Sequence, residues 1–208
     1  MKKALLSLVG ILWFTFAFGQ NFDRPKNQFL GISMSRSKHG TGDIAGISFN
    51  TEYSRNIRKR ISMIVTFGGT LHDGSKSLIY SSPSGETIDG SIRYTTGGIQ
   101  TSFGIGYDFI QTLHHAFQVR LSPLLRYQST SYYDVLTILF PPITGLPIPV
   151  VYFENLTPAR TFAIGAMGHT SYNFTPKNRN IFRLFGEFQL DSNGDVISGL
   201  GVSWGMKF

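Results

Sequence analysis

Three residues of the types used in nucleophilic catalysis lie near one another in the C-terminal part of the chain. His169 and Ser171 are two positions apart, so on a β-strand both side chains point to the same face. A base beside a hydroxyl is the arrangement that nucleophilic catalysis needs, and Glu187 on the next expected strand is a candidate third member. We favour the alternative, a hydrogen-bonded polar pair inside the protein, and predict no catalytic residue.

Two other segments carry side chains of the metal-binding type. Segment 191–195 begins like a calcium loop, but Val196 stands where that loop needs glycine and Val202 where it needs a bidentate glutamate. The Asn-Gly pair at 193–194 is instead a strong hairpin-turn signal. The His pair at 114–115 has no third ligand near it in sequence, and the chain has no Cys. We therefore predict neither a metal nor a cofactor.

Composition narrows the class of protein further. Charged residues make up 15% of the 208 positions, well below the quarter or so that is usual in soluble domains. Mean hydropathy is close to zero, which argues against a helical membrane protein. The formal net charge is +7, but the charges are scattered and few flank aromatic residues, so we predict no nucleic-acid partner.

The N-terminus has the pattern of an export signal. Lys2 and Lys3 precede an apolar run over 4–18, which is followed by small Gly19. This run is shorter than the roughly 20 residues that a membrane-spanning helix needs. A signal peptide is therefore expected over 1–20, with one mature domain over 21–208.

The rest of the chain alternates between apolar and small polar residues with a period of two, which is typical of β-strands. A phase slip near Gly97 and Gly98 predicts a β-bulge. Short links alternate with long ones, the longest at 72–91 and 129–160. Eight such strands predict an all-β, antiparallel, up-and-down transmembrane barrel with short periplasmic turns and longer outer loops. The expected strands are 29–35, 46–54, 61–71, 92–108, 116–128, 161–174, 181–190 and 196–208.

The polar face of these strands decides which side faces lipid. It carries mainly Gly, Ser, Thr, Asn and Gln, which suit a narrow lumen, whereas a soluble lipocalin-like barrel would expose Lys and Glu there. The apolar face is therefore expected to contact lipid. Two rows of aromatic residues resemble interfacial girdles. They are Tyr53, Tyr107, Phe109, Phe117, Phe174 and Phe182 near the short turns, and Tyr94, Tyr127, Tyr132 and Phe162 near the long loops.

The few charged residues on the polar face are expected in the lumen, where an isolated charge is costly and must pair. We predict a structural network that closes the lumen; a gated ion path is the alternative. The predicted members are Glu52, Arg120, Arg126, Arg183, Glu187 and Lys207.

The last strand carries a family resemblance. Val202, Trp204, Met206 and Phe208 alternate to the final residue, and this resembles the C-terminal insertion signal of bacterial outer-membrane barrels. The strand pattern as a whole resembles the small eight-stranded outer-membrane protein family. The resemblance implies the Gram-negative outer membrane, contact with its lipid and recognition by the barrel-assembly machinery. The family includes structural barrels, adhesins, subunits of larger machines and lipid-modifying enzymes, so membership leaves the function open.

One enzyme class within that family needs a direct comparison. The pair His169 and Ser171 is similar to the inline His-x-Ser pair of outer-membrane lipid A deacylases. The Asn that follows the Ser in those enzymes is Tyr172 here, and the pair lies on the expected lumen face rather than the lipid face. We therefore predict a non-enzymatic barrel with a structural, surface-binding or accessory-subunit role; the alternative is a lipid-modifying enzyme.

The segment 132–153 is the least ordinary part of the chain. Its four prolines exclude a spanning helix, and its halves are rich in β-formers that are apolar on both faces. A hairpin above the membrane is predicted, and exposed apolar surface there marks a contact site for a partner protein or a ligand. The alternative is packing against the protein's own 72–91 loop. The candidate contact residues are Leu136, Ile138, Phe140, Ile148, Val150 and Tyr152.

Overall fold

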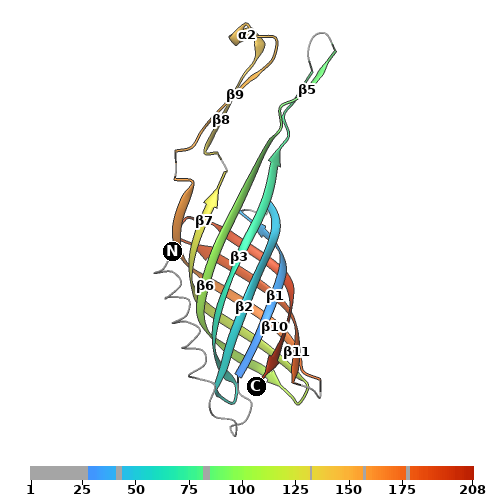
Figure 1. The fold of residues 1–208 in the computed structure, drawn as a ribbon, viewed down its shortest axis with the longest axis vertical. Helices are drawn as coiled ribbons and strands as arrows, with labels where there is room; N and C mark the ends of the chain where they lie inside the picture. The colour runs from blue at the N-terminus through green and yellow to red at the C-terminus, as the bar shows by residue number, and fades with distance from the viewer. Residues whose placement is uncertain (1–27, 41–43, 82–84, 132, 157, 177–178) are drawn as a thin grey trace, which may run out of the picture.

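The computed structural model describes residues 28–40, 44–81, 85–131, 133–156, 158–176 and 179–208. The predicted signal peptide over 1–20 lies outside these residues. Eight strands form the barrel, and they span Gln28–His39 (β1), Ile44–Arg58 (β2), Ile61–Lys76 (β3), Ile92–Gln111 (β6), His115–Thr130 (β7), Arg160–Phe174 (β10), Asn180–Asp191 (β11) and Val196–Lys207 (β12). Each pairs antiparallel with its neighbours, and β1 closes the ring by pairing with both β2 and β12 (Figure 1). The predicted fold class is confirmed.

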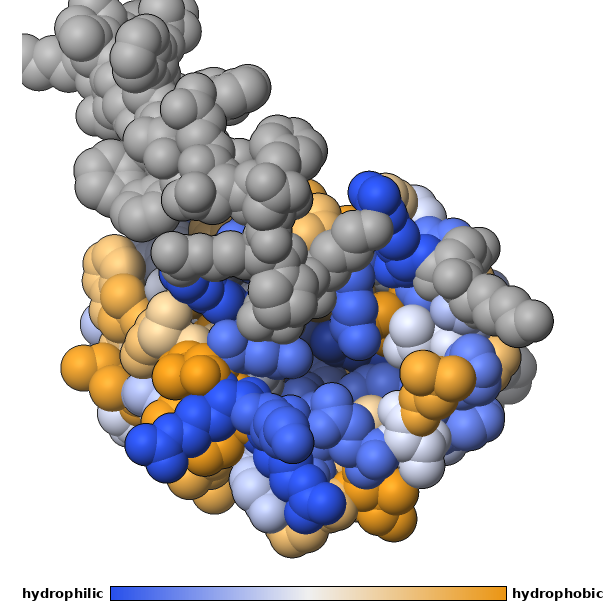
Figure 2. All heavy atoms as spheres, turned by 90° about the horizontal axis from the view of Figure 1, so that it is seen from below, coloured by the Kyte–Doolittle hydropathy of each residue, from blue (hydrophilic) through white to orange (hydrophobic). Residues whose placement is uncertain are grey.

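The two faces of the wall are those that the alternation predicts. On β1, Ser35 and Ser37 are buried in the lumen, whereas Leu30, Ile32 and Met34 are exposed on the outside. Seen from below, hydrophilic residues surround the mouth of the barrel and hydrophobic residues gather around its rim (Figure 2). So large an exposed apolar surface is stable in contact with lipid and unfavourable in contact with water. The outer wall is therefore that of a transmembrane barrel.

Two arms rise above one end of the barrel (Figure 1). The first continues β3 and β6 to the pair Lys76 and Ile92, and then into β4 (Ile79–Ser81) and β5 (Thr87–Asp89). At its base Arg93 donates a 2.8 Å hydrogen bond to Asp73. Hydrogen bonds from Arg93 and Thr95 lower the pKa of the Asp73 carboxyl.

The second arm is the hairpin predicted over 132–153. It consists of β8 (Val135–Leu139), the short helix α2 (Pro141–Thr144) and β9 (Val150–Glu154). β8 and β9 form a separate two-stranded sheet rather than a direct extension of β7 and β10. Among the described residues, no helix is both long and apolar enough to cross a membrane.

Two details of the sequence prediction are wrong. The pairing of β6 with β3 and β7 runs unbroken through Gly97 and Gly98, so no bulge lies there. Two successive glycines cannot be assigned to the polar or the apolar face from their residue type, so the alternation is interrupted there as it would be at a bulge. Tyr94 does not belong to a girdle, because it packs edge-on against buried Tyr133 at a ring distance of 6.3 Å above the barrel. Tyr132 lies outside the described residues.

Candidate functional site

The centre of the lumen holds a buried ion-pair cluster. Glu52 on β2 accepts hydrogen bonds from Arg120 on β7, at 3.0 Å, and from Arg183 on β11, at 2.5 Å. All three side chains are at least nine-tenths buried. The guanidinium of Arg183 also lies 4.0 Å from the ring centroid of Phe29, a cation–π geometry. One carboxylate thus stabilises two arginines that are almost fully buried.

Glu187 lies close to this cluster but has hydroxyl partners. Its Oε1 accepts hydrogen bonds from Ser35, at 2.8 Å, and Ser48, at 2.6 Å, and these two hydroxyls also contact each other. With Glu187 included, two carboxylates face two guanidiniums. The centre of the lumen is therefore neutral overall and its carboxylates are hydrogen-bonded, as burial requires.

Arg126 belongs to a different group at the end of the lumen that carries the arms. It donates to Asp191 at 3.4 Å and lies 4.0 Å from Asp195, beside the turn between β11 and β12. His39 Nε2 lies 3.4 Å from Asp195, and Gln128 donates to the same carboxylate at 2.6 Å. The predicted network is therefore divided, because the register places Arg126 above the central cluster.

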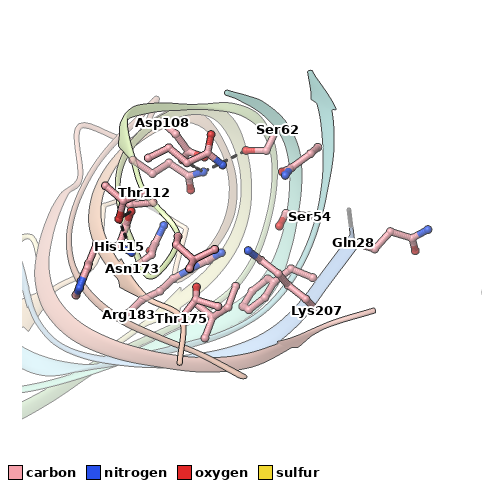
Figure 3. Close-up of a pocket in the computed structure, with 17 residues that line it drawn as sticks. Gln28, Ser54, Ser62, Asp108, Thr112, His115, Asn173, Thr175, Arg183 and Lys207 are labelled. Atoms are coloured by element: carbon pink, nitrogen blue, oxygen red, sulfur yellow. Dashed lines mark hydrogen bonds between the residues drawn. The ribbon is translucent and has the colours of Figure 1, made fainter. Parts of the chain in front are cut away.

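Lys207 lies in a third group, at the opposite end of the lumen. It lines a small pocket of about 70 Å³ together with Asp108, Ser62 and Arg183 (Figure 3). Gln118 joins the walls there by donating to Asp108, at 2.9 Å, and to Ser62, at 3.2 Å. A cavity of this size accommodates a few waters and no larger ligand.

These three groups lead to an electrical prediction. Purified wild-type protein in a planar bilayer should show no stable unitary conductance, because side chains occupy the lumen at both mouths and at the centre. Single-channel recording measures this directly. Steady current steps that depend on the presence of the protein would contradict a closed lumen.

The pair His169 and Ser171 is not arranged for catalysis. Both face the lumen, and the His169 ring stacks on Phe185 with centroids 4.8 Å apart. Within the described part of the chain, Nδ1 of His169 and Oγ of Ser171 have no hydrogen-bond partner. Glu187 lies opposite His169 in the register, but its Oε1 accepts from serines instead. The favoured interpretation, a hydrogen-bonded pair, is therefore wrong, and the triad is not assembled either.

The other candidate residues lie on the outside. The members of the predicted insertion signal, Val202, Trp204, Met206 and Phe208, all point outward and are exposed. In the β8–β9 hairpin, Leu136, Ile138 and Val150 are half-buried, whereas Phe140, Ile148 and Tyr152 are exposed. No group of three or more His, Cys, Asp or Glu among the described residues could hold a metal ion.

Two residues on the lipid-facing wall lie outside the strands that the sequence predicts. Arg36 and Lys38 lie beyond the end of the strand expected at 29–35, but β1 continues to His39 and places both side chains outside. The alternation of Arg36 and Lys38 with Ser35, Ser37 and His39 is the signal that could have extended the strand.

Comparison with known proteins gives the fold class. No protein-family model matches the sequence, and no curated protein matches it. Among solved structures, Ail, the attachment invasion locus protein of Yersinia pestis, was crystallised with the heparin analogue sucrose octasulfate. It is 11% identical, with a TM-score of 0.52, covering 88% of this chain and 98% of Ail. Neisserial surface protein A (NspA) is 13% identical, with a TM-score of 0.54, covering 87% of this chain and 97% of NspA.

These similarities and the wall chemistry define the class. The chain has the fold of small eight-stranded outer-membrane barrels. It presents an apolar surface to lipid and a polar, ion-paired interior. It is a transmembrane β-barrel of the outer-membrane type.

Proposed function

We propose that this protein is a non-enzymatic integral protein of the Gram-negative outer membrane that binds a partner protein through its extracellular hairpin. In this role it is a surface-binding protein or an accessory subunit of an outer-membrane complex. Residues 1–20 are removed on export, which N-terminal sequencing of the membrane form tests. The outward row on β12 is the proposed contact for the barrel-assembly machinery, and lipid covers the rest of the wall.

The observation that carries the proposal is the apolar surface of the hairpin. Phe140, Ile148 and Tyr152 are 49%, 47% and 52% exposed, although they lie beyond the lipid-covered strands. Further exposed apolar residues on the same arm are Ile143, Leu146, Phe153 and Leu156. Apolar surface gathered outside both core and lipid is typical of an interaction site.

The hairpin is held at its base and leaves its tip largely open. Ser131 and Thr95 exchange hydrogen bonds of 2.8 and 3.0 Å, which fastens the start of the hairpin to β6. Near the tip, Tyr80 of the other arm approaches Phe140 with ring centroids 6.5 Å apart. β6 therefore holds the base, and the 72–91 loop accounts for one ring contact at the tip among the described residues. The exposed apolar residues of the hairpin are available to a partner.

The charges of the hairpin indicate what kind of partner fits. Segment 133–156 contains no Lys or Arg, and its acidic residues are Asp134 and Glu154. A sulfated ligand such as the one crystallised with Ail needs cations, so it does not suit this surface. Aromatic and aliphatic side chains with few charges are typical of the centre of a protein–protein interface.

The test compares two loop deletions in native membranes. Deleting 136–149 should leave a heat-modifiable, folded barrel and remove the proteins that co-purify with the wild type. Deleting 79–89 from the other arm is the matched control, and it should leave most of those proteins in place. Quantitative mass spectrometry of both pull-downs is the measurement. An identical partner set for the wild type and the 136–149 deletion would contradict the proposed role.

The alternative role, a lipid A deacylase, gives a separate expectation. Expression of the wild type should leave the number of acyl chains on lipid A unchanged, because His169, Ser171 and Glu187 are not hydrogen-bonded to one another among the described contacts. Mass spectrometry of extracted lipid A measures this. Loss of an acyl chain with the wild type, absent with Ser171→Ala, would establish the enzyme instead.

A further inference from the structure

The outer wall of the barrel carries a long groove that the hairpin function does not use. It has a volume of about 900 Å³ and crosses five strands, from β7 over β10, β11 and β12 to β1. Leu121 and Val119 lie at the β7 end, and Arg36 and Lys38 lie at the β1 end. With strands about 4.8 Å apart, a groove across five strands is roughly 20 Å long.

The register explains how these residues align. One cross-strand row runs from Leu121 through Gly168, Phe188 and Ser198 to Lys38. The adjacent row runs from Val119 through Thr170, Gly186 and Leu200 to Arg36. Both rows point outward, and each ends in a cation on β1. The groove is therefore apolar along its length and positive at one end.

The floor of the groove is open because glycines face the lipid there. A Cβ added at Gly168 would meet no atom closer than 4.0 Å, and one at Gly186 none closer than 3.4 Å. By contrast, a Cβ at Gly104 or Gly201 would approach neighbouring atoms to 1.9 or 2.3 Å. Close packing thus accounts for Gly104 and Gly201 but not for the two glycines that form the floor.

Two cations lie at the β1 end of the groove. Arg36 and Lys38 are exposed, and neither makes an ion pair with any residue that the structure describes. Their barrel-wall neighbours include exposed Ile47 and Leu200. A charge on the lipid-facing wall is tolerated near the membrane interface, where an anionic group can compensate it. β1 ends at His39 on the side of the barrel that carries the arms, so this interface is the outer one.

We propose that the groove binds lipid A, the phosphorylated acyl lipid of the outer leaflet, as a specific ligand. The lipid phosphate lies between Arg36 and Lys38, and one acyl chain lies along the floor over Gly168 and Gly186. The guanidinium of Arg36 suits a phosphate because its N–H groups can donate in parallel, and Lys38 adds a second positive charge. A second copy of this chain is a poorer occupant, because it would bring a further pair of cations. The proposal rests on the outer-membrane location proposed above, but not on the hairpin.

The test measures binding of bisphosphorylated lipid A to the full mature barrel, refolded in a non-ionic detergent, by native mass spectrometry. The double variant Arg36→Gln/Lys38→Gln should weaken binding about tenfold or more, because charge-assisted hydrogen bonds are lost. Arg160→Gln is the matched control: it removes an exposed cation at the same end of the barrel, outside the groove. Arg160→Gln should weaken lipid A binding less than about twofold, which is much less than the tenfold loss expected for the double variant.

A second pair of variants tests the acyl chain. Gly186→Leu fills the floor and should weaken binding about tenfold, while Ala166→Leu, which points outward on β10 beyond the groove, should leave it unchanged. Fully dephosphorylated lipid A should bind the wild type as weakly as bisphosphorylated lipid A binds the double variant Arg36→Gln/Lys38→Gln. If Gly186→Leu fails to fold by the heat-modifiability assay, the dephosphorylated lipid and the double variant Arg36→Gln/Lys38→Gln still test whether the groove binds lipid A.

Three results would overturn the proposal. The first is equal binding of lipid A by the wild type and the double variant Arg36→Gln/Lys38→Gln. The second is an equal loss on Arg160→Gln, which would indicate non-specific charge attraction. The third is a dimer of the wild type that Gly186→Leu dissolves, which would show that a second copy covers the groove. Deleting 136–149 should leave lipid binding unchanged, so failure of this proposal and failure of the hairpin function are distinguishable.

Discussion

Glu52→Gln should destabilise the folded barrel by about 3–5 kcal/mol, the cost of leaving buried charges without their partner. Glu52 is the carboxylate that bonds both Arg120 and Arg183, at 3.0 and 2.5 Å. The variant keeps the shape of the side chain but leaves two almost fully buried guanidiniums without the carboxylate that both of them bond. Glu187 compensates only at a distance, because Ser35 and Ser48 bond its Oε1.

The measurement is reversible urea unfolding in detergent or lipid vesicles, followed by the fluorescence of Trp204 on the outer wall. Asp73→Asn is the matched control. It removes the carboxylate of an ion pair with Arg93 whose side chains are 51% and 79% exposed, and such pairs contribute little. The midpoint should therefore move for Glu52→Gln and stay in place for Asp73→Asn. Equal midpoints for Glu52→Gln and the wild type would show that the cluster is not a stability determinant.

Gly68→Ala should be the other strongly disruptive change, costing about 1–3 kcal/mol or more through overpacking. Gly68 lies on β3 against β2, and a Cβ there would stand 2.0 Å from the carbonyl oxygen of Phe49. A backbone atom cannot rotate away as a side chain can, so the two strands would have to separate and weaken their hydrogen bonds.

Gly97→Ala on β6 provides the comparison for Gly68→Ala. The nearest atom to an added Cβ there is 3.7 Å away, an ordinary contact, so folding should be unaffected. The heat-modifiable shift on electrophoresis and the urea midpoint measure both variants. A folded Gly68→Ala barrel with the wild-type midpoint would show that the β2–β3 spacing adapts without cost.

Much of the architecture could be predicted because β-strands carry local information. Side chains alternate between faces, so the pattern Leu30, Ile32, Met34 is enough to assign the lipid side of β1. The prolines of 132–153 likewise predict a turn between two apolar strands, and the β8–β9 hairpin has that form. The bulge expected at Gly97 and Gly98 failed for a related reason, since residues without side chains carry no alternation.

The sequence by itself determined the barrel class, the two faces of its wall and the hairpin above it, because each depends on residues close together in the chain. Only the tertiary structure decided which charges meet. Glu52 bonds Arg120 and Arg183, 68 and 131 positions away, because ring closure and register place these residues at one level. The same register brings Arg126 to Asp191 and aligns Arg36 and Lys38 with the groove. It also places Glu187 opposite His169, but Glu187 accepts hydrogen bonds from Ser35 and Ser48, which only the folded chain brings to it.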